Sequence, residues 1–114
     1  MTKFVFPDLS KPQAVWWPVT IDVPLNSASD GAGTVEPQTL RARFVVATDE
    51  KISELLKIGQ AALLAHVVVD WECTDEAVQP VPFERFAEIS GVPYVGDGFT
   101  RAYFDFLGRA PRKN

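Results

Sequence analysis

The stretch AALLAHVVVDWECTDEAVQPVPFERF, residues 61–86, decides the fold of this 114-residue chain. Its first nine residues contain one polar side chain, that of His66, so the segment lacks the polar face of a surface helix. A segment that is apolar on every side is buried all round, either in its own core or against another chain. The acidic turn that follows ends in Pro80-Val81-Pro82, where each proline holds the residue before it in extended geometry. We therefore expect a buried segment, a turn and a rigid connector into a short helix.

A helix is expected to precede this stretch. Thr48 followed by Asp49 and Glu50 is typical of a helix N-terminus, because the hydroxyl caps the first turn and the helix dipole favours negative charge there. Gly59 favours a bend or a break, since glycine costs about 1 kcal/mol relative to alanine in a helix interior. Beyond residue 64, the β-branched run at residues 66–69 suits either a helix or a short strand. One apolar stripe at helical spacing continues through both parts: Ile52, Leu55, Leu56, Leu63 and Val67.

The first half of the chain has the alternation of β-strands. Residues 15–23 place apolar side chains at every second position, and residues 39–46 repeat this pattern. Between them, residues 25–33 (LNSASDGAG) have the composition of a turn. These features predict a long β-hairpin. Pro18 and Pro24 cannot donate to a ladder, so either the first strand lies at a sheet edge or the prolines lie at its ends.

The last third of the chain is expected to be helical. A short helix follows the prolines and ends at Gly91, Gly96 and Gly98 mark a loop, and a final helix covers residues 99–107. The expected fold class is therefore α+β, with an N-terminal β-hairpin or small antiparallel sheet followed by a helical C-terminal half. At this length we expect a single domain over residues 1–114, with flexible ends at residues 1–12 and 109–114.

Composition excludes several classes of function. There are 11 Lys and Arg against 15 Asp and Glu, a net charge of −4, so the chain has no general attraction for nucleic acid. No stretch has the length of a signal peptide core or of a membrane span, and the single cysteine cannot form an internal disulfide. We therefore expect a cytoplasmic protein without nucleic-acid or membrane partners.

The charges are unevenly distributed along the sequence. Acidic residues concentrate between residues 70 and 88, and basic residues concentrate after residue 101. Two interpretations stay open from this pattern. One is a solvated acidic loop with a basic tail; the other is head-to-tail attraction between copies of the chain.

No set of residues with catalytic or metal-binding spacing is present. His66 is the only candidate general base, and no nucleophile stands in an obvious relation to it. Acidic neighbours raise the pKa of the Cys73 thiol, which opposes thiolate chemistry. The carboxylates of residues 70–76 lack the spacing and the central glycine of a calcium loop. We expect no catalytic residue, no metal and no cofactor, and hence a protein that is not an enzyme.

Candidate interaction residues come from the aromatic and all-apolar positions. Trp16 and Trp17 are adjacent on a strand, so their rings point to opposite faces and one is a candidate anchor for another chain. Leu64 and Val68 belong to the segment with more apolar faces than a small core covers, so we expect them to bind a partner. A structural role is expected for the remaining aromatic and hinge residues: Trp71, Pro82, Phe83, Phe86 and Tyr103.

The order of these motifs resembles the tail assembly chaperones of long-tailed bacteriophages. A hairpin ending in RFVVATDEKISELL is followed by VVVDW, an acidic turn, PVPFERFAEI and a final RAYFDFLG. The likeness covers residues 17–108, and its sharpest parts are Trp71 and the connector that ends at Phe83. In the family the tryptophan is usually followed by a glycine, and the acidic turn often holds a second glycine. In this chain Glu72 and Cys73 follow the tryptophan instead.

The resemblance implies a role without catalysis. Such proteins bind the long, helical, aggregation-prone tape measure protein in the host cytoplasm and hold it soluble while tail tube subunits polymerise around it. They are then displaced and are absent from the finished virion. The tape measure protein is thus the expected partner, with the tail tube protein as a second one. A homo-oligomer is expected from the residues themselves, because the segment at residues 61–69 has more apolar faces than a small core covers. The alternative is a minor tail or tail-completion protein that stays in the virion, and a second rival is a small host enzyme or ligand-binding domain.

Overall fold

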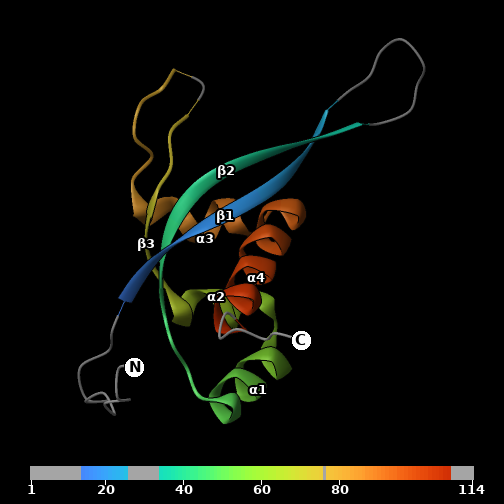
Figure 1. Ribbon diagram of the computed structural model, residues 1–114, viewed down its shortest axis with the longest axis vertical. Helices are drawn as coiled ribbons and strands as arrows, with labels where there is room; N and C mark the ends of the chain where they lie inside the picture. The colour runs from blue at the N-terminus through green and yellow to red at the C-terminus, as the bar shows by residue number, and fades with distance from the viewer. Residues whose placement is uncertain (1–13, 26–33, 76, 109–114) are drawn as a thin grey trace, which may run out of the picture.

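A three-stranded antiparallel sheet forms the N-terminal part of the molecule (Figure 1). The computed structural model describes residues 14–25, 34–75 and 77–108. Strand β1 (Ala14–Leu25) pairs with β2 (Thr34–Val45), and β2 pairs on its other side with β3 (Val68–Glu72). With helices in the C-terminal half, the α+β prediction is confirmed. The ends at residues 1–12 and 109–114, and the expected turn after Leu25, lie outside the described residues.

The hairpin is longer than the alternation predicted, because β2 begins at Thr34 instead of near residue 39. Residues 34–38 (TVEPQ) carry no apolar alternation, and all five are exposed. Their strand geometry comes from pairing with β1, whose register continues without a break to Leu25↔Thr34. The far ends of β1 and β2 consequently form an arm, defined here as residues 22–25 and 34–38.

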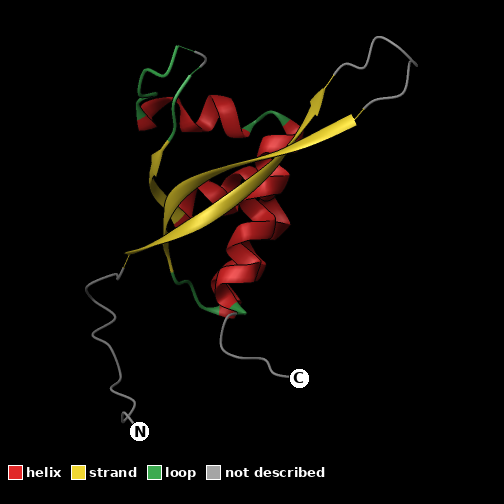
Figure 2. Cartoon of the chain, turned by 45° about the horizontal axis from the view of Figure 1, so that its top comes forward, coloured by secondary structure: helices red, strands yellow, loops and turns green. Residues whose placement is uncertain are grey.

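The helices cover one face of the sheet (Figure 2). They are α1 (Asp49–Ile58), α2 (Gln60–Val67), the 3-10 turn η1 (Phe83–Arg85), α3 (Phe86–Ser90) and α4 (Pro93–Leu107). Helix α4 packs along β1, α2 and α3 pack against α4, and α1 contacts α2. The opposite face of the sheet carries no helix in the described part of the chain.

The predicted helix start at Thr48 and the break at Gly59 are both confirmed. The Thr48 hydroxyl oxygen accepts a hydrogen bond from the backbone N–H of Lys51 at 3.2 Å. Gly59 has φ 150° and ψ 168°, outside the helical region, and separates α1 from α2. Residues 66–69, for which helix and strand were both open, are divided between the two: α2 ends at Val67 and strand β3 begins at Val68.

The expected loop at residues 96–98 is wrong. Helix α4 begins at Pro93, the favoured first-turn position for proline, and runs through both glycines. A Cβ on Gly98 would lie 2.9 Å from the carbonyl oxygen of Thr20 and 2.8 Å from Cδ1 of Ile21. The glycine therefore lets α4 approach the backbone of β1, and this packing outweighs its low helix propensity.

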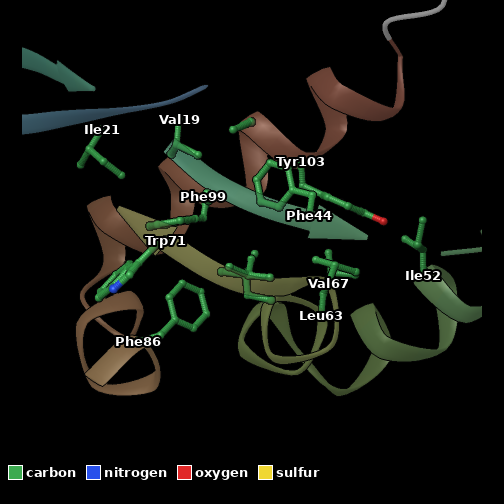
Figure 3. Packing of buried hydrophobic residues seen from close by; sticks show 14 of the residues in the cluster. Val19, Ile21, Phe44, Ile52, Leu63, Val67, Trp71, Phe86, Phe99 and Tyr103 are labelled. Atoms are coloured by element: carbon green, nitrogen blue, oxygen red, sulfur yellow. The ribbon is translucent and has the colours of Figure 1, made fainter. Parts of the chain in front are cut away.

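The core lies between the sheet and the helices (Figure 3). Phe44, at its centre, meets the ring of Tyr103 edge-on with centroids 5.3 Å apart. Trp71, Phe86 and Phe99 form a second aromatic group in the same core. Strand β3, in the middle of the sequence, thus contributes to the same core as the C-terminal helix. The side chains without solvent exposure come from both halves of the chain: Val19, Ala42, Phe44, Leu63, Val67, Phe99 and Tyr103.

Candidate partner-binding surface

Trp71 joins strand β3 to the proline connector. Its indole N–H donates a hydrogen bond to the carbonyl oxygen of Val81 at 2.9 Å, and only 6% of the residue is exposed. The ring meets Phe86 edge-on at 5.5 Å and Phe83 edge-on at 6.0 Å. Both aromatic partners come from the segment directly after Pro82. The sharpest motif of the sequence therefore folds into one packed unit (Figure 3).

Pro82 and Phe83 lead the chain from the connector into the helices. Pro82 has φ −66° and ψ 147°, the extended geometry expected before a helix start, and is itself exposed. Phe83 stacks on Phe86 with ring centroids 5.2 Å apart and planes 17° apart. The backbone N–H of Val81 donates a hydrogen bond to the carbonyl oxygen of Cys73 at 2.8 Å. A backbone hydrogen bond and the packing of aromatic rings thus both fix the connector.

Tyr103 fastens the last helix to the end of β2. Its buried hydroxyl donates to the carbonyl oxygen of Val45 at 2.9 Å and accepts from the backbone N–H of Ala47 at 3.1 Å. Burial raises the pKa of this phenol, and the hydrogen bond from Ala47 opposes the rise. Both backbone groups lie where the chain leaves the sheet for α1, so Tyr103 holds that connection in place.

The expectation that Leu64 and Val68 form a partner-binding surface is wrong. Leu64 is 1% exposed and Val68 is 3% exposed, because both side chains belong to the chain's own core. The all-apolar pattern of residues 61–69 is explained by burial under the sheet and against α4. Neither residue offers surface to a partner in this conformation.

Trp16 and Trp17 point to opposite faces of β1, as their adjacency requires. Trp17 lies on the helix side, where its ring meets that of Phe106 edge-on at 5.3 Å. Trp16 lies on the open face, half-buried beneath two guanidinium groups. Arg41 is 4.9 Å and Arg43 is 5.9 Å from the centre of its ring. Cation–π contacts of this kind contribute about 0.5–1 kcal/mol at exposed sites, so they favour a fixed ring on this face.

A groove of about 410 Å³ lies where β2 extends past the end of β3. One wall is the hairpin, another is the end of β3 with Cys73 and Thr74, and the third is formed by α3 and the first turns of α4. These elements meet below the arm, which leaves the molecule at the same end as the loop after β3 (Figures 1 and 2). The partly exposed apolar side chains that line the groove are Val23, Leu40, Ile89, Tyr94 and Val95.

Sequence patterns did not identify this groove. Leu40 belongs to the predicted second strand at residues 39–46, but Tyr94, which also lines the groove, falls between the predicted helix end at Gly91 and the expected loop at residues 96–98. The one available signal was Pro93, which is favoured at the first position of a helix and could have placed Tyr94 and Val95 on it. The meeting of these residues with β2 depends on the tertiary packing of α4.

The side chains that could take part in catalysis or bind a metal are dispersed. His66 is exposed at the end of α2, and among the described residues no group of three or more His, Cys, Asp and Glu side chains is placed to hold a metal ion. Burial raises the pKa of the Cys73 thiol, Arg85 lowers it, and Asp75 adds a smaller increase. Burial is therefore the main cause of the shift, ahead of the acidic neighbours named from the sequence.

The acidic turn after β3 is organised by Asp75. Its carboxylate accepts hydrogen bonds from the backbone N–H groups of Ala77 at 2.9 Å and Gln79 at 3.0 Å. Val78, inside this turn, has φ 60° and is 75% exposed. The neighbouring ion pair, Arg85 with Glu88 at 3.1 Å, lowers the pKa of Glu88 through its hydrogen bond and charge. Most of the acidic segment is thus solvated surface in this conformation.

Across the described ranges, no helix is long and apolar enough to cross a membrane. Comparison of the chain with protein-family models, with curated proteins and with solved structures finds no significant match.

Proposed function

We propose that this protein is a tail assembly chaperone of a long-tailed bacteriophage or prophage. In this role it binds the tape measure protein in the host cytoplasm, keeps it soluble while the tail tube assembles, and is left out of the finished particle. The observation that carries the proposal is the unit built around Trp71. The residues on which the resemblance is sharpest pack against one another through the indole hydrogen bond to Val81 and the rings of Phe83 and Phe86.

The form of the molecule suits a role in binding. A chaperone of this kind needs open apolar surface, and the groove between the hairpin and α4 supplies it. Tyr94 is 38% exposed there, and Leu40 and Val95 are partly exposed beside it. An amphipathic helix lays its apolar face into such a groove. The net charge of −4 favours solubility of the complex.

Co-expression tests this function. The tape measure protein encoded with this chain is produced alone and together with it, and the soluble fraction is measured after centrifugation. We expect the tape measure protein to aggregate alone and to co-purify with the chain when both are present. An equally insoluble tape measure protein in both cultures would reject the chaperone role.

Mass spectrometry of purified particles separates the chaperone from its main alternative. A chaperone is absent from the finished virion, whereas a minor tail or tail-completion protein is retained at a fixed copy number. Peptides of this chain recovered in stoichiometric amounts would assign it to the structural class.

We also propose that copies of the chain associate. Helix α1 buries a single residue, Ile52, and leaves Ile58 77% exposed at its end. Val46, just before the helix, is 67% exposed. Sedimentation velocity over a wide concentration range tests this, with Ile58→Glu expected to shift the protein toward the monomer. Ser53→Glu adds the same charge at another exposed position of the helix and is the matched control.

A further inference from the structure

Helices α1 and α2 share one apolar stripe, although a break after Ile58 separates them. At 100° per residue, the apolar positions of both helices would fall within an arc of about 120° on a single continuous helix. Two helices that only pack against each other do not need a common phase. The sequence therefore suits a straight helix over residues 49–67 as well as the bent pair in the structure. The residues of the shared stripe are Ile52, Leu55, Leu56, Leu63 and Val67.

Gly59 is the one residue between the two helices that is not helical. Its φ of 150° and ψ of 168° belong to a region that residues with a side chain rarely adopt. A Cβ at this position would meet no atom within 4 Å, so the backbone angles and not a crowded neighbour require the glycine. Helix α1 is also weakly attached, since Ile52 is its one buried residue. A change of backbone angles at Gly59 would thus join α1 and α2 into one helix.

A straight helix over residues 49–67 would hold its two ends about 28 Å apart, at 1.5 Å per residue. In the structure these ends lead to neighbouring strands, because Phe44 of β2 pairs with Val68 of β3 (Figure 1). The connector of residues 45–48 reaches at most about 14 Å when fully extended, and paired strands lie about 5 Å apart. Once the helix is straight, β2 therefore cannot pair with β3 of the same chain.

We propose that two copies associate by exchanging the halves of the chain before and after Gly59, across a straightened α1–α2 helix. The hairpin and α1 of each copy then pack on the second half of the other, through contacts that the single chain makes within itself. The exchanged surfaces are complementary because the structure already contains them: β2 on β3, α4 along β1 and α1 on α2. The inference rests on the association of copies proposed above, because it specifies how they join.

Exposed apolar side chains lie beside the hinge. Ile58 is 77% exposed and Leu56 is 43% exposed in the single chain. In the exchanged dimer both straight helices connect the same two packed bodies, so they run antiparallel beside each other. Leu56 and Ile58 lie near the middle of each helix, where apolar surface of one helix can cover that of the other. The cost of bringing two chains together opposes this gain, so the dimer depends on concentration.

Chemical cross-linking distinguishes exchange from contact between closed copies. Asp22 in the first half and Arg101 in the second form an exposed ion pair at 3.3 Å. Both are replaced by cysteine in a Cys73→Ser background, and the dimer isolated by size exclusion is treated with a short bismaleimide. An exchanged dimer gives a covalent dimer on a denaturing gel, because the link joins two chains. A dimer whose links all stay within one chain would overturn the proposal.

A second cysteine pair is the matched control for cross-linking by chance encounter. Arg85 and Glu88 also form an exposed ion pair, at 3.1 Å, but both lie in the second half of the chain. With cysteines at these two positions the link stays within one chain in either kind of dimer. The denaturing gel should therefore show a monomer band for this pair and a dimer band for the pair that joins the two halves.

Gly59→Ala tests the hinge. Alanine disfavours a φ of 150° and favours a helix, and each dimer contains two hinges, so dimerisation should be at least about tenfold tighter. Gly91→Ala is the matched control, since Gly91 also ends a helix but has an ordinary φ of −71°, and its dimer affinity should be unchanged. Sedimentation velocity measures both variants. A folded Gly59→Ala variant with unchanged or weaker dimerisation would contradict the exchange.

An insertion keeps the test decisive if Gly59→Ala does not fold. Gly-Ser-Gly placed after Gly59 lets a single chain close on itself and interrupts the straight helix, and a longer hinge connection opposes exchange. This variant should remain monomeric at concentrations at which wild type dimerises. An exchanged dimer that forms with wild-type affinity despite the insertion would show that no straight helix is involved and reject the proposal.

The outcomes separate this inference from the proposed function. If the wild-type dimer carries links only within chains but wild type keeps the tape measure protein soluble, the chaperone role stands and the exchange is wrong. If wild type fails in co-expression while its dimer carries links between chains, the exchange stands and the chaperone role is wrong.

Discussion

The indole N–H of Trp71 and the carbonyl oxygen of Val81 are 2.9 Å apart, and their hydrogen bond closes a ten-residue excursion of the chain. Both groups are buried, so the bond has no competing water. Between them lies the acidic turn, whose two sides are also joined by an antiparallel β-bridge between Thr74 and Pro80. One buried hydrogen bond therefore fixes where β3 ends relative to where the helices begin.

Trp71→Ala should destabilise the protein by about 3–5 kcal/mol, because it removes a buried ring that contacts Phe83 and Phe86. Trp71→Phe keeps an aromatic ring but leaves the Val81 carbonyl without its donor, and should cost about 1–3 kcal/mol. Urea denaturation of the two variants and wild type measures both differences. A Trp71→Phe variant as stable as wild type would show that the hydrogen bond contributes nothing.

Tyr103→Phe should lower the free energy of unfolding by about 1–3 kcal/mol at neutral pH, since it removes both hydrogen bonds made by the hydroxyl. The ring itself stays buried against Phe44, so the loss isolates the hydroxyl. Chemical denaturation at neutral pH is the measurement, with retained near-ultraviolet circular dichroism as the check that the core packing survives.

The same tyrosine predicts a pH dependence. Burial raises the pKa of Tyr103 in the folded state above its ordinary value of about 10. Above that pH the unfolded chain loses the proton while the folded protein keeps it, so folding stability is complete below about pH 10 and falls as pH rises through the folded pKa. Wild type should therefore lose more stability than Tyr103→Phe between about pH 9 and 11. Parallel stability curves for the two proteins would contradict the shift.

Gly98→Ala should destabilise the protein although alanine is the better helix former by about 1 kcal/mol. The added methyl group would meet the backbone oxygen of Thr20 at 2.9 Å, and a backbone atom in a sheet cannot move aside cheaply. Overpacking of this kind typically costs about 1–3 kcal/mol. Thermal denaturation gives the sign, and a melting temperature above that of wild type would show that α4 and β1 can separate without loss.

Gly96 and Gly98, which lie in α4 and not in a loop, show which features local sequence patterns do not predict. The Trp71 unit was predictable because its members lie within about one turn and one connector of each other, and local patterns describe such neighbours. The contact of Gly98 with Thr20 joins residues far apart in the chain, so a glycine required by packing had the same appearance as a glycine in a loop. The α+β class, α1 and the break at Gly59 followed from local signals; the length of β2 and the course of α4 did not.

The candidate site was predicted less well for the same reason. Leu64 and Val68 were assigned to a partner because an all-apolar segment fits a core and an interface equally, and only the packing against α4 decides for the core. Trp16 was recognised as one of two opposed rings, but its arginine neighbours on β2 depend on the strand register. The groove requires Leu40, Ile89 and Tyr94 to meet, and no local pattern relates these three.

Val78 gives a prediction in which a substitution stabilises the protein. It is the one non-glycine residue with positive φ among those described, and its φ of 60° lies in the left-handed region. That region costs an L-residue about 1–2 kcal/mol, whereas glycine adopts it freely. Because Val78 is 75% exposed, Val78→Gly gives up little buried surface. The expected gain is about 1 kcal/mol after the added flexibility of glycine in the unfolded chain is subtracted.

Thermal denaturation measures this gain, and a control comes from the same part of the chain. Val69 is also an exposed valine, at 43%, but it lies in β3 and does not have positive φ. Val69→Gly should therefore lower the melting temperature, since glycine weakens a strand and relieves no strain there. Val78→Gly should raise it by a few degrees. If both substitutions lower the melting temperature by the same amount, the turn holds Val78 without strain, and Asp75 alone accounts for its geometry.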